Sequence, residues 1–298
     1  MDYILEMDIL NESAQFDMRN TIIESFELEA IREGFSRKSL ANFFRKAVEM
    51  VTGWANTLKA WATKIFGPII NKYKKYRAAN LNKAYQSGKM IKVNCPYYEV
   101  KVKVFNAALA EGNNNYKNIF EGIKYIESNI DKFLSKKMNV NLGDERIWKM
   151  IKTDKSQLPA PLNKASKIED FMTKYNFGYV DKELVNLILQ NQKNLDIMSK
   201  SIDNNIKQIL QLYAGINERA EKYENMMSKD SGEDMPGAAD VVHCYNILLK
   251  GTALTGNIFN SLRTIAMKGI NEYCNVVNKI MKAIGADSQP ASAAAGMQ

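Results

Sequence analysis

Apolar side chains recur in steps of three and four residues along two long stretches, 181–228 and from about 235 to 284. This spacing keeps them on one side of an α-helix. At about 1.5 Å per residue, the first stretch would form a helix roughly 70 Å long. The polar run 229–234 between the stretches predicts a turn, so we expect two antiparallel helices. The apolar positions of the first helix are Leu184, Ile188, Leu195, Met198, Ile202, Ile206, Ile209, Tyr213, Ile216, Ala220, Tyr223 and Met227.

Polar and small residues also fall within these two patterns. Asn191 and Asn205 lie on or near the apolar seam, where a polar residue lowers stability but can fix the register of the helices. Gly251 and Gly256 lack the Lys-Ser/Thr that follows a phosphate-binding loop, and no strand precedes them. We therefore expect these glycines to allow close packing between helices.

Another helical pattern begins at Leu40, after Ser36 or Ser39 as a candidate cap. Its apolar stripe is wide, which is typical of a multi-helix bundle and less so of a two-stranded coiled coil. Proline lacks the backbone amide, so Gly67-Pro68 should interrupt or kink the helix. The apolar positions are Leu40, Phe44, Ala47, Val51, Trp54, Leu58, Trp61 and Ile65.

A β pattern is present only at 89–105, where Val100, Val102 and Val104 alternate with charged residues after a turn-like Asn94-Cys95-Pro96. This alternation predicts one small β-hairpin with one apolar face. A helical pattern returns at about 115–137. The stretch 139–166 contains Leu158-Pro159-Ala160-Pro161 and is typical of a connector, with a short helix expected near Ile147-Trp148.

These patterns predict a mainly α fold: an elongated helical bundle with a long antiparallel helical hairpin and one small β-hairpin. The chain has 298 residues, of which 46% are hydrophobic, so it can bury a substantial core. The expected organisation is an acidic arm at 1–33, a basic helical region at 34–138 that includes the β-hairpin, a connector at 139–166, the helical hairpin at 167–285 and a mobile tail at 286–298.

The sharpest boundary in the sequence is one of charge. Residues 1–33 carry nine acidic and two basic side chains, whereas residues 34–92 carry thirteen Lys/Arg and one Glu. Their net charges are therefore −7 and +12. Segregated charge indicates partners and association more than fold. The acidic arm is expected either to cover the basic tract until a partner competes for it or to dock on a neighbouring subunit.

Candidate catalytic chemistry is sparse. His243 is the only histidine, so one chain cannot supply a His-based triad or a multi-His metal site. The three cysteines, Cys95, Cys244 and Cys274, are widely spaced and lack the paired C-x-x-C pattern of a zinc site. We predict a protein that is not an enzyme, with no catalytic residues, no cofactor and no metal site.

The basic tract is the candidate binding region. Its lysines and arginines alternate with aromatic residues, a mixture that suits contact with a membrane surface or with nucleic acid. The alternative is that the aromatic residues belong to the core and the basic side chains form a solvated face. The candidate residues for contact with a polyanion or membrane are Lys59, Lys64, Lys72, Lys74, Lys75, Arg77 and Lys83.

In the overall character of its sequence, the chain resembles structural or internal virion proteins of tailed bacteriophages. The resemblance rests on the acidic start Met1-Asp2-Tyr3-Ile4-Leu5-Glu6, the long hairpin helices and the small-residue tail at 286–298. It implies a virion component that assembles through helical contacts with other subunits, either as a homo-oligomer or with other virion proteins. It transfers no site residue.

The resulting hypothesis is a non-enzymatic structural or assembly protein whose basic tract contacts a polyanion. A membrane-active helical protein and a nucleic-acid-associated protein are the alternatives, and a membrane is the less favoured partner. No uncharged stretch reaches 18 apolar residues, so a spanning helix is not expected. The acidic start differs from a secretory signal. We expect synthesis in the cytoplasm of a host cell, followed by incorporation into the virion.

Overall fold

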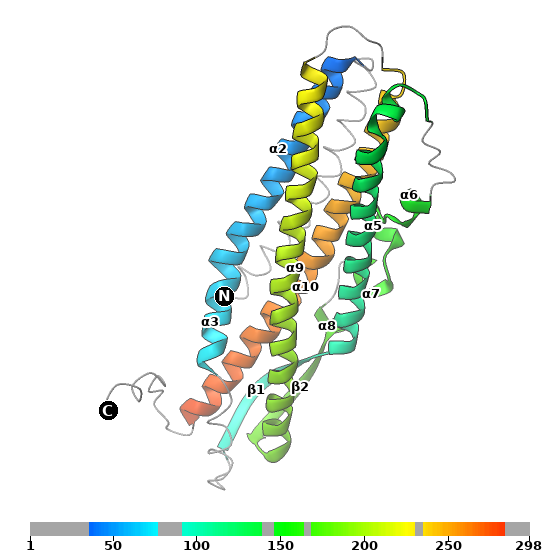
Figure 1. Ribbon diagram of the computed structural model, residues 1–298. Coiled ribbons are helices and arrows are strands. Elements are labelled where there is room, and N and C mark those ends of the chain that lie inside the picture. Colours follow the sequence, from blue (N-terminus) through cyan, green and yellow to red (C-terminus); the bar gives the residue numbers. More distant parts are fainter. Residues whose placement is uncertain (1–35, 77–90, 139–145, 164–167, 230–234, 284–298) are drawn as a thin grey trace, which may run out of the picture. The chain divides into compact units, whose positions relative to one another are not determined.

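The computed structural model describes residues 36–76, 91–138, 146–163, 168–229 and 235–283 (Figure 1). The predicted mainly α fold is confirmed. The predicted acidic arm at 1–33 and tail at 286–298 lie outside the described residues. In chain order, the elements are α2 (Arg37–Trp61), the π-helix η1 (Ala62–Phe66), α3 (Gly67–Lys75), β1 (Ile91–Val100), α5 (Val102–Leu134), α6 (Arg146–Met150), the 3₁₀ helix η3 (Lys155–Gln157), α7 (Ala160–Asn163), α8 (Ile168–Phe171), β2 (Met172–Val180), α9 (Lys182–Ser228) and α10 (Ala238–Ala283).

The chain divides into two compact units, and each is built from three separate stretches of sequence. The described residues of unit 1 fall within 1–59, 108–165 and 205–261. Those of unit 2 fall within 60–107, 166–204 and 262–298. Helices α9 and α10 therefore each contribute one part to unit 1 and another part to unit 2.

In unit 1, parts of four long helices pack against one another. The rings of Trp54 on α2 and Tyr213 on α9 are 5.9 Å apart, and Phe44 on α2 lies 5.3 Å from Tyr245 on α10. The contact of Gly122 with Leu248 brings α5 against α10. Burial of these apolar and aromatic faces is the main stabilising contribution of such a bundle.

The predicted antiparallel pairing of the two longest helices is confirmed within each unit. In unit 1, the Tyr245 hydroxyl of α10 donates to the Ile216 carbonyl of α9 at 3.0 Å. In unit 2, the Tyr273 hydroxyl of α10 donates to Oε1 of Gln192 on α9 at 2.8 Å. Gly256 also approaches Tyr213 in unit 1, and Gly269 approaches Leu195 in unit 2. Within each unit, residue numbers therefore rise along α9 as they fall along α10, which defines an antiparallel pair.

Unit 2 contains a small antiparallel sheet, and its second strand differs from the prediction. Strand β1 forms within the expected region, but it pairs with β2, from Val100↔Met172 to Ile91↔Val180. The predicted β-hairpin within 89–105 is therefore wrong. Val102 and Val104 belong to α5, whose inward positions at Phe105 and Ala108 follow a helical period. Because the alternation covers only three valines, it is also compatible with the start of a helix.

Close backbone approaches explain two glycines of unit 1. A Cβ on Gly251 would lie 2.5 Å from Cγ2 of Ile151, and one on Gly237 would overlap the Phe133 carbonyl. The prediction that Gly251 allows close packing is confirmed. Gly237 brings the start of α10 against the end of α5, where its amide donates to the Leu134 carbonyl at 3.3 Å. Larger residues at these positions would force the neighbouring groups apart.

Candidate functional site

The part of the basic tract that the structure describes up to residue 76 forms one continuous helical stretch across Gly67-Pro68. The serine cap is confirmed, since the Ser39 amide donates to the Ser36 hydroxyl at 3.2 Å and α2 begins at Arg37. The regular α-helix ends at Trp61, and the Gly67 amide then donates to the Ala62 carbonyl, five residues back. A π-turn of this kind accommodates the proline, which lacks an amide. The predicted interruption is therefore five residues of π-helix, after which α3 continues.

Four of the predicted contact residues lie on η1 and α3 in unit 2. Lys64, Lys74 and Lys75 are exposed, and Lys72 is half-buried. We call these four lysines the α3 basic surface. None of them forms an ion pair with another residue in the part of the chain that the structure describes. Lys59 is exposed and belongs to unit 1, whereas Arg77 and Lys83 lie outside the described residues.

The aromatic residues of η1 and α3 point into unit 2. Phe66 and Tyr73 are 4% and 2% exposed. The Tyr73 hydroxyl lies 3.0 Å from both the Gln192 carbonyl and Oδ1 of Asp196 on α9, and its ring packs edge-on against Tyr273. Because Phe66 and Tyr73 are held in the core, they are not available to stack on bases or to enter a membrane.

Trp61 and Arg263 secure the same helical stretch at η1. The Trp61 ring stacks on Phe66 with centroids 5.4 Å apart, and the Arg263 guanidinium lies 5.0 Å from the Trp61 centroid. Arg263 is 4% exposed. An arginine over an indole face is an attractive arrangement for both groups. Trp61 therefore makes its contacts within unit 2. The exposed charged side chains of η1 and α3 are lysines.

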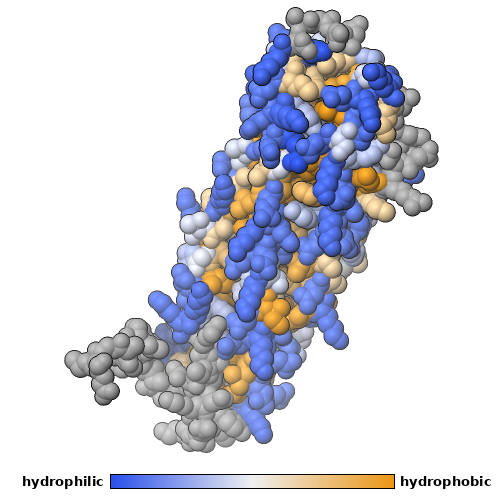
Figure 2. All heavy atoms as spheres, in the orientation of Figure 1, coloured by the Kyte–Doolittle hydropathy of each residue, from blue (hydrophilic) through white to orange (hydrophobic). Residues whose placement is uncertain are grey.

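Positive charge is concentrated on this helical stretch. Residues 37–75 carry nine Lys/Arg and one acid, Glu49, whereas α5 carries four basic and four acidic side chains and α9 carries six of each. Hydrophilic side chains are mixed with paler and hydrophobic ones along the side of the view in Figure 2 where α2 and α3 lie. The α3 basic surface can therefore attract an anionic partner by charge, and such attraction weakens as salt screens it.

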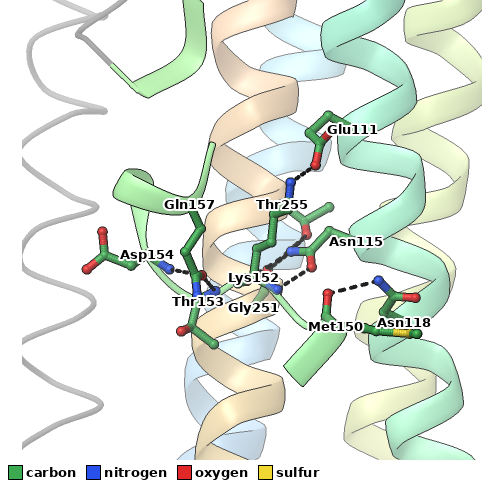
Figure 3. Close-up of polar contacts among 10 residues, drawn as sticks. All are labelled: Glu111, Asn115, Asn118, Met150, Lys152, Thr153, Asp154, Gln157, Gly251 and Thr255. Atoms are coloured by element: carbon green, nitrogen blue, oxygen red, sulfur yellow. Dashed lines mark hydrogen bonds and ion pairs between the residues drawn. The ribbon is translucent and has the colours of Figure 1, made fainter. Parts of the chain in front are cut away.

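A second group of polar residues lies in unit 1 around Asn115, a buried residue of α5 (Figure 3). Its Oδ1 accepts from the Lys152 amide at 2.7 Å. Its Nδ2 donates to the Lys152 carbonyl and to the Thr255 hydroxyl, both at 3.0 Å. Lys152 also forms an ion pair with Glu111. These bonds attach the irregular segment after α6 to α5 and α10, so we interpret the group as a structural clamp.

Unit 2 contains a comparable residue, Asn191, which is fully buried on α9. Its Oδ1 accepts from the Val100 amide at 3.3 Å, and its Nδ2 donates to the Tyr98 carbonyl at 3.2 Å and to the Tyr97 hydroxyl at 2.6 Å. Tyr98 and Val100 direct their backbone groups to the same edge of β1, because residues two apart in a strand do so. The side-chain amide of Asn191 thus makes the backbone hydrogen bonds that a third strand would make at this edge of β1.

Sequence reasoning placed Asn191 on the seam but did not identify its partners, and it missed Asn115. The signal for both is an asparagine at a position where the helical pattern requires an apolar residue. A buried amide is expected to be hydrogen-bonded, and Asn191 and Asn115 meet this expectation through non-helical backbone nearby. The signal is not sufficient by itself, because the buried Asn246 side chain of α10 has no hydrogen-bond partner among the described residues.

The residues considered for catalysis are dispersed. His243 is exposed on α10, whereas its neighbour Cys244 is buried on another side of the helix. Burial raises the pKa of the Cys274 thiol to about 11, which keeps it protonated near neutral pH. Within the described ranges, no three His, Cys, Asp or Glu side chains are grouped so that they could hold a metal ion.

No helix of the described residues is long and apolar enough to cross a membrane. Comparisons with protein-family models, with curated proteins and with solved structures found no match for this chain. The geometry of the α3 basic surface and the residues that build it therefore carry the functional argument.

Proposed function

We propose that this protein is a non-enzymatic helical assembly protein, a virion component that binds other subunits through its helices and a polyanion through the α3 basic surface. The observation that carries the polyanion contact is the separation of side chains on α3. On η1 and α3, the aromatic residues Phe66 and Tyr73 are buried. The lysines of the α3 basic surface, three of them exposed and Lys72 half-buried, have no acidic partners among the described residues. Such a surface suits a ligand recognised by charge alone.

The assembly part of the proposal is supported by the long helices and by the style of the sequence. Helices α9 and α10 span 47 and 46 residues, and Ile197 on α9 is 50% exposed. A single exposed apolar side chain is ordinary on a protein surface. The length of these helices, which offers an extended face to another subunit, is therefore the stronger support. The resemblance to virion proteins of tailed bacteriophages favours the same class, with synthesis in the host cytoplasm before incorporation into the particle.

The two alternatives are less well supported. A membrane-surface binder needs aromatic or large apolar side chains beside its lysines. Phe66 of η1 and Tyr73 of α3 are instead buried. A dedicated nucleic-acid reader needs groups that contact base edges or stack on bases. The α3 basic surface offers lysines alone, so nucleic acid would bind there as one polyanion among others.

Binding of the intact protein to heparin and to double-stranded DNA at several salt concentrations tests the polyanion contact. The triple variant Lys64→Gln/Lys74→Gln/Lys75→Gln removes three charges from the α3 basic surface. Its control, Lys117→Gln/Lys132→Gln/Lys207→Gln, removes three exposed charges from α5 and α9. For DNA, we expect the α3 variant to lower the log–log salt slope by about two to three and the control by much less.

Equal losses in both variants would contradict a specific surface, since net charge alone would then explain binding. Flotation with anionic liposomes separates the membrane alternative, which predicts retention that persists at high salt through apolar insertion. Native mass spectrometry of the purified protein tests the assembly part. A strictly monomeric species, with no other subunit in the particle or complex from which it is isolated, would contradict that part.

A further inference from the structure

The residues that precede the described helices have a charge opposite to that of the helices. Residues 1–33 carry a net charge of −7, and α2 begins at Arg37, only a few residues later. The described residues as a whole carry 34 Lys/Arg and 18 Asp/Glu, a net charge of +16. The acidic side chains that lower the charge of the whole chain to +8 are thus concentrated before the first described helix.

We propose that residues 1–33 bind the α3 basic surface of their own chain and compete there with the polyanion. The inference rests on the proposed function, because it assigns a regulator to the same surface. Lys64, Lys72, Lys74 and Lys75 fall within twelve residues that contain no acid. On α9, the acid-free runs 184–195 and 204–217 contain one lysine each, whereas the run 64–75 contains four. This run therefore offers an acidic segment a higher density of positive charge and no like-charge repulsion within it.

The tether is long enough for this contact. Ser36 and Lys75 are joined by helical residues, which rise about 1.5 Å each, so the two residues lie at most about 60 Å apart. An extended segment of 33 residues reaches roughly 110 Å. A segment tethered in this way has an effective concentration on the order of millimolar, which favours binding within the chain over binding to a second molecule in dilute solution.

The contact would be reversible by its nature. Each exposed ion pair contributes little and is screened by salt, so several weak pairs together hold the segment. A polyanion with a high density of charge offers the same lysines more partners at once. It therefore displaces the segment, which then becomes available for other contacts.

The test compares two full-length triple variants with the same net charge. Glu24→Gln/Glu27→Gln/Glu29→Gln removes three carboxylates from the acidic segment. Asp203→Asn/Glu218→Gln/Glu221→Gln removes three exposed carboxylates from α9. With heparin at low salt, we expect the first variant to bind about tenfold more tightly than the wild type and the second to change much less. The difference should vanish at high salt. Equal effects of the two variants would overturn the inference.

Carbodiimide cross-linking of the dilute wild-type protein locates the contact directly. This reagent joins a carboxylate to an amine in direct contact. We expect monomeric products in which acids of 1–33 are joined to Lys64, Lys72, Lys74 or Lys75, and we expect high salt to abolish them. Products joined only between chains, or only at other lysines, would overturn the inference.

The two proposals fail in different ways. If the α3 lysine variant loses heparin binding while the two acidic variants behave alike, the polyanion surface stands and its regulation by 1–33 is wrong. If the α3 lysine variant binds heparin as well as its control does, the proposed function itself is wrong.

Discussion

Units 1 and 2 use the same two helices, α9 and α10, against different partners. In unit 1, these helices meet other helices, and the contacts are aromatic rings and glycines such as Phe44 against Tyr245 and Gly251 against Ile119. In unit 2, they also meet a two-stranded sheet, and the contacts include a network of hydrogen-bonded tyrosines and amides. A helix satisfies its own backbone, whereas the edge of a strand needs an external partner.

Asn191 and Asn115 show the same principle at two places. Each is a buried amide on a helix, and each bonds the backbone of a segment that is not helical. The difference lies in the surroundings of that segment. Val100 lies in the core of unit 2, whereas Lys152 is partly exposed and its backbone can regain water when the segment opens. Removing the amide should therefore cost more at Asn191 than at Asn115.

The largest effect is expected where a charge enters the α9 seam of unit 1. Ile209 is 1% exposed, so Ile209→Asp buries an unpaired carboxylate and should lower the free energy of unfolding by about 3–5 kcal/mol. Ile216→Asp should do the same. Far-UV circular dichroism during thermal unfolding provides the measurement. Gln211→Asp, on the exposed side of α9, is the control. An unchanged melting temperature in Ile209→Asp would show that this side of α9 is not buried.

Asn191→Leu tests the polar contacts of unit 2. The leucine leaves the Val100 amide, the Tyr98 carbonyl and the Tyr97 hydroxyl without partners, so we expect a loss of about 2–4 kcal/mol. Hydrogen exchange of the Val100 amide should accelerate along with global unfolding. Asn186→Leu, at an exposed position on α9, is the control. If the two variants are equally stable, the amide contributes no more than an ordinary surface residue.

Asn115→Leu should have a smaller and more local effect in unit 1. We expect a loss of about 1–3 kcal/mol and faster proteolytic cleavage after Lys152 or Lys155, because the clamp on this segment is lost. Asn114→Leu, exposed on the same helix, serves as the control. A cost as large as that of Asn191→Leu would contradict the comparison between a buried strand and a partly exposed segment.

Much of the helical fold could be predicted from the sequence, because the period of the apolar residues reports which side of a helix is buried. The patterns at 40–65, 115–137 and 181–228 correspond to α2, α5 and α9. The pairing of β1 with β2 could not be predicted, since the strands are separated by 71 residues and share no turn. Periodicity reports a buried side, but it does not identify the segment that covers it.

The candidate site was predictable in its residues but not in its geometry. The run of lysines from Lys59 to Lys75 is evident in the sequence, as is its alternation with aromatic residues. Whether Phe66 and Tyr73 face solvent or the core depends on α9 and α10, which lie more than a hundred residues away. That tertiary contact decides between a surface that inserts or stacks and one that acts by charge alone.

The smallest effects on stability are expected for substitutions of two tyrosines in one aromatic cluster of unit 1. Tyr223 and Tyr245 both pack against Phe44, with ring centroids 5.3 Å away. The Tyr245 hydroxyl donates to the Ile216 carbonyl, whereas the buried Tyr223 hydroxyl has no hydrogen-bond partner in the described part of the chain. Tyr245→Phe should therefore cost about 1 kcal/mol, and Tyr223→Phe should be close to neutral. Urea denaturation at neutral pH measures both, and equal costs would contradict the assignment.

The Tyr223 hydroxyl also makes the stability of the protein depend on pH. Burial, followed by the nearby Glu127 carboxylate, raises the pKa of Tyr223 from 10.0 to about 12. The folded state thus favours the neutral phenol of Tyr223. The stability that this preference contributes is complete below pH 10 and is lost as the pH rises from 10 to 12. Burial also raises the pKa of Tyr245, so the wild-type protein should lose stability steeply over this range. Tyr223→Phe removes one of the titrating groups and should make the decline shallower in urea denaturation between pH 9 and 11. A decline as steep as that of the wild type would mean that the Tyr223 hydroxyl is solvated in the folded protein.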